Sequence, residues 1–79
     1  MYTDAMARAF HSLRDHAPKG FSLQVIDHDN FLTVKASEKN FFGLTTDERV
    51  MAITYMVKVK KALEANGAIV LLVREGGEE

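Results

Sequence analysis

The chain has 79 residues, of which 47% are hydrophobic, and its 10 basic and 11 acidic side chains leave a net charge of −1. This length allows one domain, and so small a domain buries only about 60% of its unfolded surface, which argues against a deep enclosed active site. The near-zero charge argues against wrapping of duplex DNA through its phosphates. Because there is no cysteine, disulfides, zinc–thiolate sites and thiol nucleophiles are excluded.

The hydropathy pattern predicts a cytoplasmic protein. No window approaches the roughly 18 apolar residues of a membrane span, and the first residues lack a basic region followed by a long apolar segment. We expect residues 1–75 to form a single α+β domain. The glycine-rich, acidic residues 76–79 are expected to form a flexible tail.

The first predicted element is a helix of about 13 residues. Thr3 or Asp4 can cap it, because both side chains accept hydrogen bonds from the first free amides of a helix. It should end near His16, since Pro18 disfavours helical backbone at the residue before it. Its apolar stripe consists of Met6, Phe10 and Leu13.

The pattern then changes to alternation, which predicts strands over residues 21–25 and 32–36 with one buried face each. Residues 27–30 carry side chains that favour tight turns, so an antiparallel hairpin is expected. His28 lies in this turn between two aspartates, which makes it a weak candidate for metal binding or proton transfer. A turn role is favoured, because adjacent turn side chains rarely point at one centre.

A capping box opens the second predicted helix. Thr45 is followed three positions later by Glu48, and such a pair can satisfy two free amides reciprocally. The helix should continue to about Asn66 and, at ~1.5 Å per residue, span about 30 Å. The stripe expected against the sheet consists of Ala52, Met56, Val59 and Leu63, flanked by Met51, Tyr55 and Ala62.

Val50, Ile53 and Val57 form a second apolar line on this helix. The apolar arc is therefore wider than one sheet face would cover. Two explanations remain open: the first helix packs on this line, or the line is a surface for a homodimer or another partner.

After the glycine at position 67, residues 68–73 form a continuous apolar run. Such a run is typical of a strand buried on both faces, so we place it inside the sheet. A right-handed crossover through the second helix would make it parallel to residues 32–36. The predicted fold is a two-layer α-β-β-α-β domain of the α+β class, with a mixed three-stranded sheet and both helices on one face.

The predicted loop at 37–43 contains Phe41, Phe42 and Gly43. Two consecutive aromatic side chains point in different directions, so one can enter the core while the other stays exposed as an anchor for a partner. The alternative is that both pack beneath the second helix.

A basic sector on the second helix consists of Arg49, Lys58, Lys60 and Lys61. It predicts either contact with nucleic acid or a solvated helix face. The Gly-x-x-Gly clamp of KH-type RNA modules is absent. No nucleophile–base pair, phosphate-binding glycine loop or paired carboxylates can be assembled, so we expect no enzymatic activity.

The segment from about Phe31 to Tyr55 resembles the BolA family. Phe41-Phe42-Gly43, with Arg49 six residues after the glycine, matches a family motif, and residues 30–34 resemble the strand before it. The resemblance implies a fold close to KH type II, partnership with monothiol glutaredoxins, iron–sulfur cluster handling and, in some members, DNA-linked regulation.

The resemblance also implies that His28 occupies the loop position where the family often offers one cluster ligand. The chain departs from the family pattern at Val50 and Met51, where members have a histidine and a second arginine. It departs again at Ala68 and Ile69, where the last strand of members begins with a histidine.

We therefore expect a small non-catalytic interaction or adaptor module, a BolA-like regulator, that docks a partner protein or a second copy of itself. One alternative is a nucleic-acid-associated regulator that uses the basic sector, and another is a small phage or plasmid protein that inhibits a host machine. No metal or cofactor is expected, except an iron–sulfur cluster if the resemblance holds. The predicted partner-binding residues are Phe41, Phe42, Gly43, Arg49, Val50, Ile53 and Val57.

Overall fold

The computed structural model describes residues 1–37 and 41–75. The predicted tail at 76–79 and part of the predicted loop at 37–43 lie outside these residues. No helix in the described ranges is long and apolar enough to cross a bilayer. The elements, in chain order, are α1 (Asp4–Ser12), the short 3-10 helix η1 (Arg14–His16), β1 (Gln24–Asp27), β2 (Leu32–Ser37), α2 (Thr46–Ala65) and β3 (Val70–Glu75).

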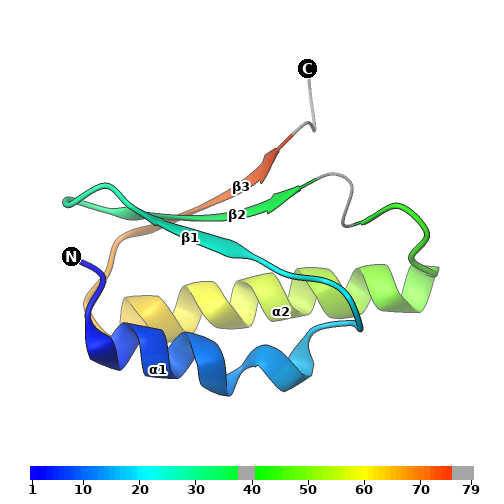
Figure 1. The fold of residues 1–79 in the computed structure, drawn as a ribbon, viewed down its shortest axis with the longest axis horizontal. Coiled ribbons are helices and arrows are strands. Elements are labelled where there is room, and N and C mark those ends of the chain that lie inside the picture. The colour runs from blue at the N-terminus through cyan, green and yellow to red at the C-terminus, as the bar shows by residue number, and fades with distance from the viewer. Residues whose placement is uncertain (38–40, 76–79) are drawn as a thin grey trace.

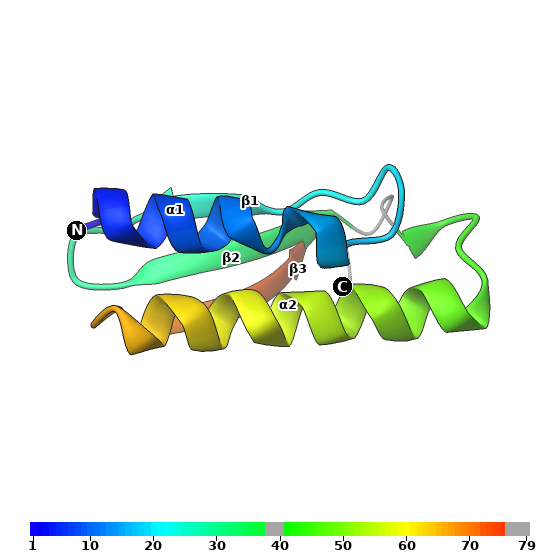
Figure 2. The same cartoon turned by 90° about the horizontal axis from the view of Figure 1, so that it is seen from below.

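The molecule has two layers, with both helices on one face of a three-stranded sheet (Figure 1). The strand order is β1-β2-β3, in which β1 and β2 are antiparallel and β2 and β3 are parallel. The two helices lie side by side, α1 on the β1 side and α2 on the β3 side (Figure 2). The predicted α+β fold is confirmed, including the direction of the last strand.

Both ends of α2 are fixed by local hydrogen bonds. The Thr45 Oγ1 accepts from the Glu48 amide at 3.1 Å, and the Glu48 Oε1 accepts from the Thr45 amide at 2.9 Å. At the other end, the amide of Gly67 donates to the Glu64 carbonyl and the amide of Ala68 to the Leu63 carbonyl. This is a Schellman motif, and it requires the left-handed backbone of Gly67, whose φ is +97°.

The first helix is shorter than predicted. Thr3 caps it as expected, with its Oγ1 accepting from the Met6 amide, but α1 ends at Ser12 and residues 14–16 wind as a 3-10 turn. Proline at position 18 forces extended backbone at Ala17. The last turn before it therefore tightens rather than continuing as an α-helix.

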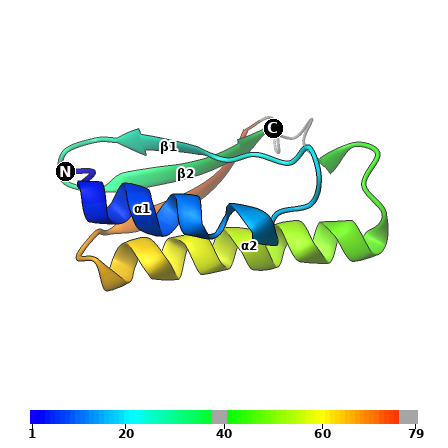
Figure 3. The ribbon, with the colours of Figure 1, turned by 60° about the horizontal axis from the view of Figure 1, so that its bottom comes forward.

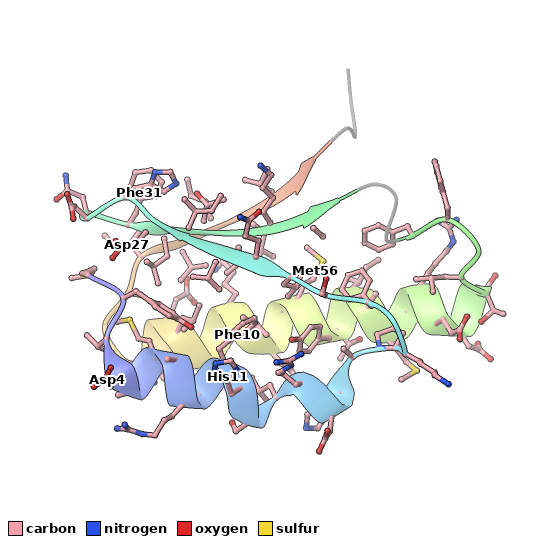
Figure 4. All side chains as sticks on the ribbon, viewed as in Figure 1. Asp4, Phe10, His11, Asp27, Phe31 and Met56 are labelled. Carbon is pink, nitrogen blue, oxygen red and sulfur yellow. The ribbon has the colours of Figure 1, made fainter. Side chains whose placement is uncertain are left out.

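The core lies between α2 and β2, with Met56 directed from α2 towards the sheet (Figure 4). The predicted stripe of α2 is buried, and of its flanking residues Tyr55 is buried, Ala62 is half-buried and Met51 is exposed. The side chains that no solvent reaches come from alternate positions of β2 and from one side of α2; they are Leu32, Val34, Ala36, Ala52, Val59 and Leu63.

The prediction of a strand over residues 21–25 is wrong at its start, because β1 begins at Gln24. Phe21 belongs to a turn in which its amide donates to the Pro18 carbonyl. Its ring is buried edge-on against the rings of Phe41 and Tyr55, with centroids 5.3 and 6.3 Å apart. The apolar alternation in the sequence therefore begins before the strand does, because Phe21 reaches the core from a turn.

The prediction that residues 68–73 lie inside the sheet is also wrong, since β3 is an edge strand. Val70 is buried, but Leu71, Leu72 and Val73 are 52%, 37% and 38% exposed. A three-stranded sheet has one interior strand, and β2 takes that place by pairing with both others. The helices cover one face only and leave the other open (Figure 3).

Candidate partner-binding surface

An apolar groove of about 350 Å³ lies between α2 and β3. Met56 and Phe41 are buried and form its floor. Ile53 and Val57, 54% and 36% exposed, form one wall from successive turns of α2, and β3 borders the other side at Leu72 and Val73, of which Leu72 lies on the helix face of the sheet. This α2–β3 groove gathers exposed aliphatic side chains from elements that are far apart in the sequence.

The first helix does not cover the line of Val50, Ile53 and Val57, all of which are exposed. Figure 2 shows α1 lying over β1, alongside α2, whereas Ile53 and Val57 border β3. The line is also divided. Ile53 and Val57 face the α2–β3 groove, whereas Val50 borders a separate hollow of about 340 Å³ between α2 and η1.

The two phenylalanines before α2 separate as the first of the two alternatives predicted. Phe41 is buried in the core and Phe42 is exposed to solvent. Between Phe42 and Leu44, Gly43 adopts a left-handed φ of +82°, and the Leu44 amide donates to the Phe41 carbonyl at 3.3 Å. This turn presents Phe42 next in sequence to the residue that forms the floor of the groove.

The backbone of β3 adds hydrogen-bonding groups to this surface. The amide of Leu32 donates to the Ile69 carbonyl at 2.8 Å, so the polar groups of position 69 face β2. Backbone groups of successive residues point to opposite sides of a strand. Those of Val70, Leu72 and Arg74 therefore face the free edge, which no strand in the described part of the chain pairs.

The opposite edge of the sheet is covered differently. The α-amino group of Met1 and the amide of Tyr2 donate to the Asp27 carboxylate at 2.6 and 2.9 Å, and the Asp29 amide donates at 2.8 Å. These bonds, first that from the α-amino group, lower the pKa of Asp27 from 3.8 to about 2. The edge strand β1 is only four residues long, and its last residue, Asp27, belongs to this charged cluster.

His28 has structural contacts in the hairpin. Its Nε2 lies 2.9 Å from the Thr33 Oγ1, and its ring stacks on Phe31 with centroids 4.5 Å apart. Phe31 lies on the sheet face away from the helices (Figure 4). Within residues 1–37 and 41–75, no three side chains of metal-ligating type come together. These contacts agree with the turn role that the sequence favoured.

The basic residues of α2 divide into three lysines close together in the helix and one distant arginine. Lys60 forms an ion pair with Glu64, with 2.7 Å between Nζ and Oε2, and the Lys58 Nζ lies 3.4 Å from the His16 Nδ1. Arg49 lies in the first turn, about 14 Å along the helix axis from Lys58. Arg49 is therefore separate from the three lysines, and Lys60 is paired with Glu64.

A further cavity, of about 450 Å³, was not predicted from the sequence. It lies where η1 and the segment leading to β1 meet α2, and its wall includes Arg14, Asp15, Lys19 and Tyr55. Burial raises the pKa of Tyr55, and the positive charge of Arg14 partly opposes that shift. The charged side chains that line this cavity are exposed and of both signs. The cavity therefore has no electrostatic potential of one sign that would attract an ion.

Leu72 and Val73 were missed as site residues, since their run was interpreted as interior. The predicted topology contained one signal. A three-stranded sheet has two edge strands, and because the first two strands pair with each other as a hairpin, the last strand must be one of the two. No family model, no curated protein and no solved structure matches this chain. Its function is therefore inferred from its own surface.

Proposed function

We propose that this chain is a small non-catalytic interaction module that binds another polypeptide in the α2–β3 groove. The observation that carries this proposal is the clustering of Ile53, Val57 and Leu72 around one hollow that Val73 also borders, each of the three more than a third exposed. Single exposed apolar side chains are ordinary on monomers, whereas a contiguous apolar patch marks an interaction site.

The groove and the free edge of β3 together favour one binding mode. An extended segment can pair with an exposed sheet edge through backbone hydrogen bonds while its alternate side chains enter neighbouring pockets. Here the edge of β3 supplies the donors and acceptors, and the groove supplies the pocket. Phe42 offers a rigid aromatic anchor next in sequence to the groove floor.

Site-specific photo-crosslinking tests this function. A photoreactive phenylalanine analogue replaces Ile53 in the groove or, as a control, Arg8, which is exposed on α1. We expect the probe at position 53, in cells that make the protein, to attach to a polypeptide in much higher yield than the probe at position 8. Adding Leu72→Asp to the probe-bearing chain should abolish that product, because a carboxylate would then face the apolar groove.

Equal and low yields from the two positions would overturn the proposal, as would a product that Leu72→Asp leaves unchanged. Attachment to a second copy and attachment to a different polypeptide both support the function. The two products differ in mass, so the same experiment identifies the occupant.

A BolA-like regulator is a narrower form of this proposal. The α-β-β-α-β order and the position of Arg49 after the 41–43 turn agree with it. The His28 ring, however, contacts Thr33 and Phe31, so His28 would have to give up both contacts to bind an iron–sulfur cluster. The interaction function does not depend on this narrower form.

A further inference from the structure

We propose that the occupant of the α2–β3 groove is a second copy of this chain, joined by antiparallel pairing of the two β3 strands about a two-fold axis at Leu72. This inference rests on the proposed function and identifies its partner. It is carried by the contrast between the sheet edges, by the composition of β3 and by the direction of its backbone groups.

The two edges of the sheet differ in protection. Monomeric proteins shield edge strands by making them short, by placing charges or proline on them, or by covering them. The β1 edge is four residues long and carries the charged cluster at Asp27. In contrast, β3 has six residues, and its first four, Val-Leu-Leu-Val, contain neither charge nor proline. The β3 edge has the features of an interface.

The composition of β3 is that of an interior strand. Continuous aliphatic runs occur in strands that are covered on both faces and paired on both sides. In one copy, β3 is paired on one side only and leaves Leu71, Leu72 and Val73 exposed. Pairing of two β3 strands gives a six-stranded sheet with both at its centre. Both sides of β3 are then paired, as the sequence pattern predicts, while the face of the sheet away from the helices stays open (Figure 3).

The backbone of β3 selects the register of this pairing. The groups of Val70, Leu72 and Arg74 face the free edge, as the bond between Leu32 and Ile69 establishes. If the axis passes at Leu72, this residue pairs with the partner's Leu72, and Val70 pairs with the partner's Arg74. These are hydrogen-bonded pairs and give about six bonds, whereas an axis at Leu71 or Val73 gives only about four within the strand.

The side chains agree with the same register. Directly opposite residues share a face, so Leu71 meets the partner's Val73 on the open face, and the two Leu72 side chains meet on the helix face. A two-fold axis perpendicular to the sheet keeps all helices on one face and brings the two α2 helices together. Ile53 and Val57, which border β3, then close over Leu72 from both copies.

Charge does not oppose self-association. Each copy has a net charge of −1, so long-range repulsion between copies is weak. Beside the groove, Lys60 is already neutralised by Glu64. At one hydrogen bond per 100–200 Å², about six backbone bonds correspond to an interface of roughly 600–1,200 Å². This size lies in the range of weak complexes and only reaches the lower limit of about 1,200 Å² for stable ones, so we expect dimerisation to depend on concentration.

Sedimentation of the purified chain over a wide range of concentration tests the proposal, with Leu72→Lys and Leu72→Glu as paired variants. We expect the wild type to dimerise and each variant to raise the dimer dissociation constant at least about 100-fold, because like charges then face each other across the axis. Mixing the two variants should restore a 1:1 dimer, since lysine faces glutamate only in this register. Val50→Lys, at an exposed position away from β3, should dimerise as the wild type does.

A wild type that stays monomeric at every concentration would overturn the inference, and so would variants that dimerise as the wild type does. If the monomer still attaches to a different polypeptide through position 53, the interaction function stands and only the second copy is rejected. Should both variants fail to fold, hydrogen exchange of the wild type decides. The amides of Leu72 and Arg74 must become protected as concentration rises, whereas unchanged exchange there rejects the dimer.

Discussion

Phe41 and Phe42 are adjacent in the chain, yet Phe41 is 3% exposed and Phe42 is 69% exposed. The Phe41 ring packs edge-on against Phe21, while Phe42 projects into solvent. We expect Phe41→Ala to lower the free energy of unfolding by roughly 3–5 kcal/mol, the usual cost of truncating a buried aromatic side chain. Urea denaturation measures it.

The matched variant Phe42→Ala should change that free energy by less than about 0.5 kcal/mol. An equal loss in both variants would mean that Phe42 is covered in solution. Repeating the comparison at low and high concentration would then show whether a second copy is what covers it.

The capping box at the start of α2 sets a second prediction. Thr45→Ala removes the acceptor for the Glu48 amide, and we expect it to lower the free energy of unfolding by about 1 kcal/mol. Thr45→Asp keeps an acceptor there and should retain most of that stability. If the alanine and aspartate variants have equal thermal midpoints, the side-chain cap contributes nothing measurable.

Gly67 gives a prediction in which backbone strain is isolated from packing. A Cβ added at this residue would meet no atom within 4 Å, so only its φ of +97° opposes a side chain. Gly67→Ala should lower the free energy of unfolding by about 1–2 kcal/mol. A synthetic chain with D-alanine at position 67, which favours positive φ, should be at least as stable as the wild type. Equal destabilisation by both alanines would instead show a steric clash.

The Asp27 cluster predicts a pH dependence. The folded pKa of about 2 lies below the ordinary 3.8, so the ionised carboxylate stabilises the fold. That contribution is complete above the ordinary pKa and is lost as the pH falls through the folded one. Between pH 3.8 and pH 2, stability should fall more steeply in the wild type than in Asp27→Asn.

Chemical denaturation at a series of pH values measures these slopes. Asp15→Asn, which removes an exposed carboxylate of η1, is the matched control and should keep the wild-type slope over the same interval. Parallel curves for the wild type and Asp27→Asn would contradict the prediction.

The elements with strong local signals were predicted well. The bounds of α2 follow from Thr45, Glu48 and Gly67, whose effects act within one turn of the chain. The turn at 27–30 is equally local, and Asp29 takes the left-handed conformation that aspartate tolerates there, with φ 71°. These features need no knowledge of the rest of the fold.

The errors arise where apolar character does not reveal what covers a residue. Phe21 extends the alternating pattern of β1 but enters the core from a turn. Leu72 belongs to a run typical of interior strands but lies at an edge. For the candidate surface, Ile53, Val57 and Phe42 were anticipated because a helix wheel and an aromatic pair are local patterns. Leu72 and Val73 required the strand order, which depends on the whole topology.

The parallel pairing of β2 and β3 also sets an order of assembly. The hairpin joins residues close in sequence, whereas Leu32 meets Val70 only across the whole of α2. Closing that larger loop costs more chain entropy, so we expect β3 to dock after the hairpin and the helix have formed. Until then its aliphatic run is an unattached strand. The last step of folding and the first encounter between chains therefore compete for the same six residues, and high concentration during refolding should favour aggregates linked through β3.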